Sequence, residues 1–94
     1  MNQFIQYEKY HMSRDVSITA AQIRAARALV DWSGPQLANA SGVSVPTIRR
    51  MESAVGPERS SIVNVEAVRR ALEEAGVIFQ APDDSAGPGV RLKK

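Results

Sequence analysis

The stretch Gln36–Glu52, with the sequence QLANASGVSVPTIRRME, decides the fold of this chain. It predicts two short helices joined by one glycine turn. Gly42 lies where the chain reverses, and glycine adopts a positive φ without the penalty that a Cβ atom carries. Leu37 before the turn, and Ile48 with Met51 after it, give each helix one apolar side. The predicted unit is therefore a helix, a tight turn and a second helix.

Local signals indicate where these two helices begin. Ser33 is a candidate N-cap for the first helix, and Pro35 is tolerated only in a first turn. Ser44 is a candidate N-cap for the second helix. Because Pro46 disfavours a helical residue before it, the second helix begins either at Val45, capped by Ser44, or at Pro46 itself. We expect the two helices over residues 35–41 and 45–53.

Two further helices complete the predicted core. Thr19 and Gln22 have the spacing of a capping box at the start of the first confident helix. After a Gly-Pro loop signal, Ser60 or Ser61 caps a last helix that ends before Gly76. The spacing predicts that its inner stripe consists of Ile62, Val65, Val68, Leu72 and Ala75.

Beyond this helix the composition changes. Residues 77–79 and 90–92 are β-prone and flank a loop rich in Pro, Gly and Asp, which predicts a two-stranded ribbon. A lone hairpin is marginal in water, so we expect the ribbon to pack on the helical core or to pair across a dimer, hiding Ile78 or Phe79. The predicted fold class is mainly α: a small helix-turn-helix bundle of four to five helices with a short C-terminal β-ribbon.

The predicted domain occupies residues 18–76, followed by the ribbon or tail at residues 77–94. Residues 1–17 are expected to be an N-terminal arm, either disordered or derived from cloning. The second alternative arises because His11-Met12 resembles a cloning junction and Met12 is a possible native start.

Composition argues against several classes of function. The chain has 94 residues, a net charge of +2, one histidine and no cysteine. The absence of thiols suits a reducing compartment, so we expect a cytoplasmic protein, and no apolar run is long enough to suggest a membrane. The scattered acidic pairs and single histidine assemble neither a catalytic centre nor a metal site, so we expect no enzymatic activity and no cofactor.

The central stretch resembles the Cro/repressor-type (XRE-like) helix-turn-helix family. Its pattern is Leu-Ala, three residues, Gly-Val-Ser, two residues, Thr-Ile, three residues and Glu, which runs from Leu37 to Glu52. The resemblance covers most of residues 18–77. It implies a helical DNA-binding domain, commonly a transcriptional regulator that works as a dimer. It also implies a structural ion pair between Arg27 and Glu52, which would fasten the second helix of the motif to the scaffold.

The candidate DNA contacts follow from this reading. Arg49 and Arg50 lie opposite the apolar side of the second helix, where arginine would contact guanine edges or phosphates; the alternative is that both are ordinary exposed arginines. The Thr47 hydroxyl would contact a phosphate or the backbone of its own helix. The resemblance adds Arg59 with Ser60, in the following loop, where the family commonly contacts the DNA backbone. The full predicted contact set is Ser33, Gln36, Ser44, Val45, Pro46, Thr47, Arg49, Arg50, Arg59 and Ser60.

Three positions depart from the family pattern. Val45 and Pro46 are apolar where polar residues such as glutamine or arginine are frequent, so they would touch a thymine methyl group but donate to no base edge. Gly34 stands where a polar residue usually opens the first helix and binds phosphate, which leaves Ser33 and Gln36 to supply polar contacts.

The sequence thus predicts a double-stranded DNA-binding transcriptional regulator, with residues 45–53 in the major groove and a homodimer as the working form. The alternative is a protein-interaction module on the same scaffold, such as an antitoxin or adaptor, whose partner would be a toxin or co-regulator.

Overall fold

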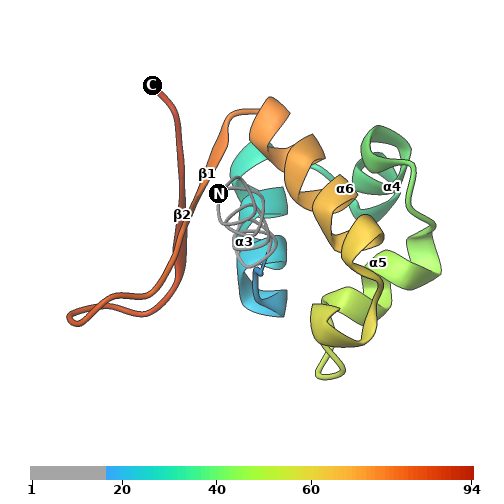
Figure 1. Cartoon of the computed structure of the whole chain (residues 1–94). Helices are drawn as coiled ribbons and strands as arrows, with labels where there is room; N and C mark the ends of the chain where they lie inside the picture. Colours follow the sequence, from blue (N-terminus) through green and yellow to red (C-terminus); the bar gives the residue numbers. More distant parts are fainter. Residues whose placement is uncertain (1–16) are drawn as a thin grey trace, which may run out of the picture.

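The computed structural model describes residues 17–94, and the predictions made for residues 1–16 lie outside this range. Its α-helices are α3 (Ala20–Val30), α4 (Gly34–Ser41), α5 (Val45–Met51) and α6 (Ile62–Glu74). The 3₁₀ turn η2 (Pro57–Arg59) precedes α6, and the strands β1 (Val77–Gln80) and β2 (Gly89–Leu92) follow it. Within this range the chain is mainly helical with a short antiparallel sheet at its end, which confirms the predicted fold class (Figure 1).

Helix α6 is the central element of the packing. It contacts α4, α3 and β1, while both strands contact α3 and α4 contacts α5. In Figure 1 the ribbon therefore lies on one side of the helices, and α4 and α5 lie on the other. The largest fully buried side chains come from every helix and from β1: Ile23, Leu37, Ile48, Met51, Val68, Leu72 and Val77.

The helices begin at side-chain caps. Thr19 accepts a hydrogen bond from the backbone N–H of Gln22, whose side chain accepts one from the Thr19 N–H, so the predicted capping box is present. Ser44 accepts from the N–H of Thr47, and Val45 is already helical; this decides between the two starts considered for α5. Because each cap satisfies an otherwise orphaned backbone donor, these starts are determined by a few adjacent residues.

The turn between α4 and α5 has the conformation that its glycine predicts. Gly42 adopts φ 77° and ψ 9°, and its N–H donates to the carbonyl of Ala38. Helix α5 then runs only to Met51, and Glu52 is its C-cap, so the predicted end at residue 53 is two residues too late. Ser53 leaves the helix and its hydroxyl donates to the carbonyl of Arg50.

The structure decides one detail of α6 and corrects another. Ser61, one of the two predicted candidates, is its N-cap. Ile62 and Ala75 are exposed, because they stand at the first helical position and at the C-cap, beyond the part of the helix that faces the core. Ala71, which was not part of the predicted inner stripe, is buried in the core.

The ribbon packs on the helical core, which is the first of the two predicted arrangements. Val77 pairs with Leu92 and Phe79 pairs with Val90. Val77 is buried, and Phe79 and Val90 pack against the core, whereas Ile78 is exposed. Since side chains alternate across a strand, burial of Val77 and Phe79 directs Ile78 outward.

Candidate nucleic-acid interface

Helix α5 has two chemically distinct sides. Ile48 and Met51 are buried in the core, whereas Arg49 and Arg50 are exposed. The three ion pairs found within residues 17–94 involve neither of these two arginines. Both guanidinium groups are thus presented to solvent from a helix whose other side is fixed by packing.

The N-terminal turn of α5 presents a mixed surface. Pro46 is exposed, and Val45 and Thr47 are half-buried. The Ser44 hydroxyl donates to Thr47 Oγ1 at 2.9 Å while accepting from the Thr47 N–H. Because the Thr47 oxygen accepts this bond, its own hydroxyl proton remains available to donate to an external acceptor.

An ion pair attaches the end of α5 to α3. Arg27 Nε lies 2.7 Å from Glu52 Oε2, and Arg27 Nη2 lies 2.9 Å from Glu52 Oε1, so the contact is bidentate. The side chains are 24% and 12% exposed. The hydrogen bond to Glu52 raises the pKa of Arg27, although partial burial opposes the shift. The structure therefore contains the pair implied by the family resemblance, and its geometry is that of a structural fastening.

Two further bonds strengthen this attachment. Arg27 Nη1 donates to the carbonyl of Trp32 at 2.9 Å, which ties the turn after α3 to the same guanidinium. Arg24 Nη1 donates to the backbone carbonyl of Glu52. Sequence reasoning missed this role of Arg24; the available signal was its position three residues before Arg27, on the same side of α3.

The start of α4 carries two of the predicted contacts. Ser33 and Gln36 form a second capping box, in which the Ser33 N–H donates to Gln36 Oε1 at 2.7 Å and the Gln36 N–H donates to Ser33 Oγ at 3.2 Å. Both residues are exposed. Each side-chain oxygen is thus occupied by the helix, which leaves the Ser33 hydroxyl proton and the Gln36 amide N–H₂ as donors.

The last two predicted contacts, Arg59 and Ser60 in the loop after α5, differ in the exposure of their side chains. Arg59 is exposed at the end of η2. The Ser60 hydroxyl is buried and makes no hydrogen bond within the described part of the chain. The η2 turn folds Ser60 inward, with its N–H donating to the carbonyl of Pro57. Ser60 is accordingly removed from the predicted contact set, and Arg59 remains in it.

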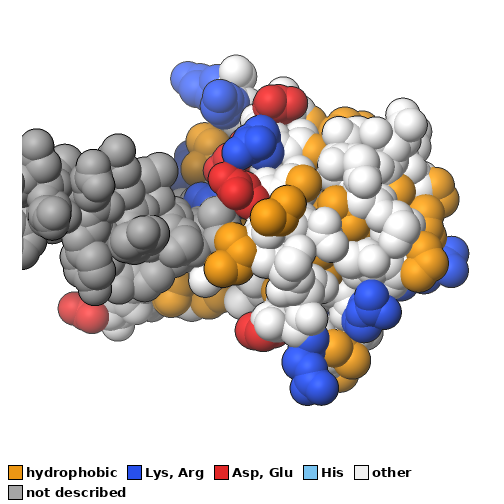
Figure 2. All heavy atoms as spheres, turned by 45° about the vertical axis from the view of Figure 1, so that its right-hand side comes forward, with side chains coloured by type: hydrophobic (Ala, Val, Ile, Leu, Met, Phe, Trp, Pro, Cys, Tyr) orange, Lys and Arg blue, Asp and Glu red, His pale blue; other side chains and the backbone are white. Residues whose placement is uncertain are grey.

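Figure 2 turns forward the side of the molecule on which α4 and α5 lie. Basic side chains stand along its lower and right-hand edges, with apolar side chains beside them. The exposed arginines of α5 and η2 are Arg49, Arg50 and Arg59. The candidate interface is defined by these arginines together with Ser33, Gln36, Ser44, Val45, Pro46 and Thr47.

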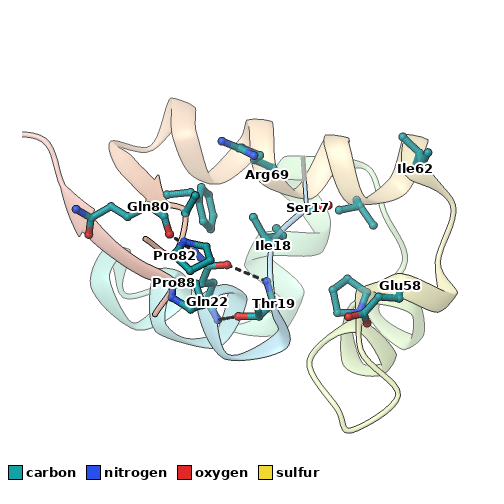
Figure 3. Close-up of a pocket in the computed structure, with 14 residues that line it drawn as sticks. Ser17, Ile18, Thr19, Gln22, Glu58, Ile62, Arg69, Gln80, Pro82 and Pro88 are labelled. Atoms are coloured by element: carbon teal, nitrogen blue, oxygen red, sulfur yellow. Dashed lines mark hydrogen bonds between the residues drawn. The ribbon is translucent and has the colours of Figure 1, made fainter. Parts of the chain in front are cut away.

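A groove of about 640 Å³ lies between the start of α3, α6 and the ribbon (Figure 3). Two of its largest polar side chains, those of Gln22 and Arg69, are already engaged within the protein. Gln22 Nε2 donates to the carbonyls of Gln80 and Gly89, and Arg69 pairs with Glu73 and lies over the Phe79 ring. These side chains help to hold α3, α6 and the ribbon together. The groove is therefore the weaker candidate for a ligand site.

Within residues 17–94, no cluster of three His, Cys, Asp or Glu side chains is arranged to hold a metal ion. The helices of this range are also too short or too polar to cross a bilayer.

Comparisons of the chain with protein-family models, curated proteins and solved structures found no match. The family resemblance therefore rests on the residues from Leu37 to Glu52.

Proposed function

We propose that this protein is a sequence-specific double-stranded DNA-binding regulator of transcription that acts as a homodimer, with α5 in the major groove. The observation that carries the proposal is the pair of exposed arginines on a helix whose opposite side is buried. A helix in this arrangement presents a rigid row of side chains, as direct reading of base edges requires.

Different parts of the candidate interface would contact different parts of the DNA. Arg49 and Arg50 would contact guanine edges or phosphates from α5. Arg59, the Gln36 amide and the Ser33 hydroxyl, which stand on neighbouring segments, would contact the phosphate backbone on either side of the groove. Phosphate contacts position the helix, whereas base contacts select the sequence.

The apolar start of α5 allows a prediction about the DNA sequence that the protein prefers. Pro46 is exposed and Val45 half-exposed, and neither side chain donates a hydrogen bond. Such groups favour a thymine methyl group in the major groove over a bare cytosine edge. The preferred half-site should therefore contain thymine beside a guanine contacted by one of the two arginines.

The primary test is selection of bound sequences from random duplex DNA, followed by affinity measurements on the selected duplex. We expect a palindromic consensus. Arg49→Ala with Arg50→Ala should weaken binding at least about 30-fold, since each lost arginine contact costs roughly 1 kcal/mol or more. The matched control is Arg70→Ala with Arg91→Ala, which removes the same charge from exposed positions on α6 and β2. Equal affinity of the two double variants would contradict the proposal.

The exposed Pro46 and half-exposed Val45 also favour a second candidate function, in which the same surface binds a toxin or co-regulator. The two functions differ in their dependence on salt. DNA binding should weaken steeply as salt rises because condensed counterions are released. A partner held by apolar contacts should remain bound in high salt, without any retardation of duplex DNA.

A further inference from the structure

The first turn of α5 offers few hydrogen-bond donors to a base. Pro46 has no backbone N–H, and the N–H of Thr47 donates to Ser44 Oγ. The Ile48 N–H donates to the carbonyl of Ser44, and the Ser44 hydroxyl donates to Thr47 Oγ1. Given these bonds within residues 17–94, the donors left in this turn are the Val45 N–H and the Thr47 hydroxyl.

The apolar side chains of the same turn are accessible. Pro46 is exposed and Val45 is half-buried, and both side chains consist of carbon and hydrogen only. Ile48 and Met51 fix the opposite side of α5 in the core, so these two side chains are held at the surface. A base pair that meets them in the major groove is therefore read by apolar contact.

The two exposed arginines follow one helical turn later. Arg49 stands four residues after Val45, and Arg50 stands four residues after Pro46, so each pair shares a side of the helix. Long side chains on a helix lean back toward its N-terminus, which brings each arginine toward the apolar residue that precedes it. An apolar contact and a guanine contact are thus available next to each other, as adjacent base pairs require.

Apolar contact distinguishes pyrimidines by their methyl groups. In the major groove, thymine presents a C5 methyl group beside its O4 acceptor, whereas cytosine presents an N4 amino donor and no methyl group. A side chain without donors or acceptors cannot bond to O4 or to the N4 amino group, so it responds to the methyl group alone. 5-Methylcytosine carries this methyl group at the same ring position as thymine.

We infer that Val45 and Pro46 recognise the 5-methyl group of a pyrimidine, so that 5-methylcytosine beside a guanine is bound as thymine is. The inference rests on the proposed function and adds to it a chemical class of ligand, namely duplex DNA methylated at cytosine. Arg49 or Arg50 contacts the neighbouring guanine, which is the same in both sequences. Methylation of a cytosine at this position thereby strengthens binding.

The first test uses the unmodified full chain and four duplexes that differ at one position of the selected half-site. The pair beside the contacted guanine is T·A, U·A, 5-methylcytosine·G or C·G. The methyl group should strengthen binding about fourfold both for T·A over U·A and for 5-methylcytosine·G over C·G, as burial of one methyl group predicts. Equal affinities for 5-methylcytosine·G and C·G would overturn the inference, because thymine would then be recognised through O4.

A substitution tests whether Pro46 reads the methyl group. Glutamine bonds to N6 and N7 of adenine, so Pro46→Gln should bind the T·A duplex at least about fivefold more tightly than the 5-methylcytosine·G duplex. The matched control is Pro35→Gln, because Pro35 is exposed and holds the same second position in α4 that Pro46 holds in α5.

Both variants should keep the circular dichroism spectrum of the unmodified chain, and Pro35→Gln should keep the fourfold methyl effect. A Pro46→Gln variant that still binds T·A and 5-methylcytosine·G equally would overturn the assignment to this side chain. The comparison of the four duplexes tests the inference even if a variant does not fold, since it uses the unmodified chain.

The outcomes separate this inference from the proposed function. If duplexes are retarded and the four affinities are equal, the protein binds DNA and the inference fails. A selected consensus without thymine beside guanine likewise overturns the inference and leaves DNA binding intact. If no duplex is retarded, the proposed function fails and the inference fails with it.

Discussion

The α4–α5 unit (residues 34–51) and the C-terminal ribbon (residues 77–92) are both built from short elements, yet they are stabilised differently. The two helices of the unit begin at serine caps whose hydrogen bonds reach three residues along the chain. The ribbon is held by the Gln22 amide, which bonds to the carbonyls of Gln80 and Gly89, 58 and 67 residues away in sequence. The α4–α5 unit is thus determined by residues close together in the sequence, whereas the ribbon depends on contacts that form only in the folded protein.

The largest expected effect comes from the contact that fixes the α4–α5 unit to α3. Arg27→Leu leaves the mostly buried Glu52 carboxylate without its partner and removes the bond to Trp32. We expect a loss of about 3 kcal/mol of folding free energy, measured by urea unfolding. DNA affinity should fall as well, because the end of α5 is released.

The control is Arg70→Leu, which removes an exposed pair with Glu66 on the surface of α6. Such pairs contribute about 0.5 kcal/mol or less. Similar losses for the two variants would show that the Arg27 contact is no stronger than a surface pair.

The next prediction compares the two glutamines of the two capping boxes. Gln22→Leu removes the Gln22 side-chain half of the α3 capping box and both bonds to the ribbon, so it should cost about 2 kcal/mol. Gln36→Leu removes only a local bond at an exposed site and should cost about 0.5 kcal/mol.

Hydrogen exchange separates local from long-range effects of these glutamines. In Gln22→Leu, amide protection should be lost in β1 and β2 before it is lost in α6. In Gln36→Leu the ribbon should remain protected. Unchanged ribbon protection in Gln22→Leu would show that apolar packing alone holds the strands.

A smaller effect is expected from the turn inside the α4–α5 unit. Gly42 has a positive φ, so Gly42→Ala should destabilise the protein by about 1 kcal/mol. Gly34 is the first residue of α4, and outside its two chain neighbours an added Cβ would meet nothing within 4 Å. Because Pro35 disfavours a helical residue before it, Gly34→Ala should still destabilise the protein slightly, by about 0.5 kcal/mol or less. Thermal unfolding should shift more for Gly42→Ala than for Gly34→Ala, and equal shifts would contradict this account.

The smallest predicted effect is in the loop of the ribbon. Backbone hydrogen bonds from Ser85 and Ala86 lower the pKa of Asp83, with a further contribution from the Ser85 hydroxyl. Because the folded pKa is depressed, the stabilisation is present above the unfolded value and is lost as pH falls through the folded one. The Ser85 and Ala86 amide resonances should shift together over this acidic range, while the strands stay paired. Asp83→Ala should abolish the shift, and its persistence would assign it to another group.

Much of the α4–α5 unit could be predicted because its signals are local. Ser44, Gly42 and the spacing of Ile48 with Met51 depend on neighbours within one helical turn. The Arg27–Glu52 contact was accessible only through the family resemblance, since its partners are 25 residues apart. Arg49 and Arg50 were placed on the exposed side of α5 because the apolar residues Ile48 and Met51 flank them in the sequence.

One choice that the sequence left open and one wrong prediction have a common physical cause. Ser60 and Ser61 are equally good caps in the sequence, and the η2 turn decides which one faces inward. The apolar spacing of α6 assigned Ile62 to the core, but Ile62 is exposed because the core does not extend to the first residue of that helix. Both residues lie where an element begins, and there the shape of the neighbouring elements controls burial.

The sequence by itself determined the caps of α3 and α4, the glycine turn and the apolar side of α5, because capping bonds and backbone preferences act over three or four residues. Only the tertiary structure decided the attachment of the ribbon through Gln22, the burial of Ser60 and the exposure of Ile62. These features depend on groups brought together from distant parts of the chain, and burial is a property of the assembled elements.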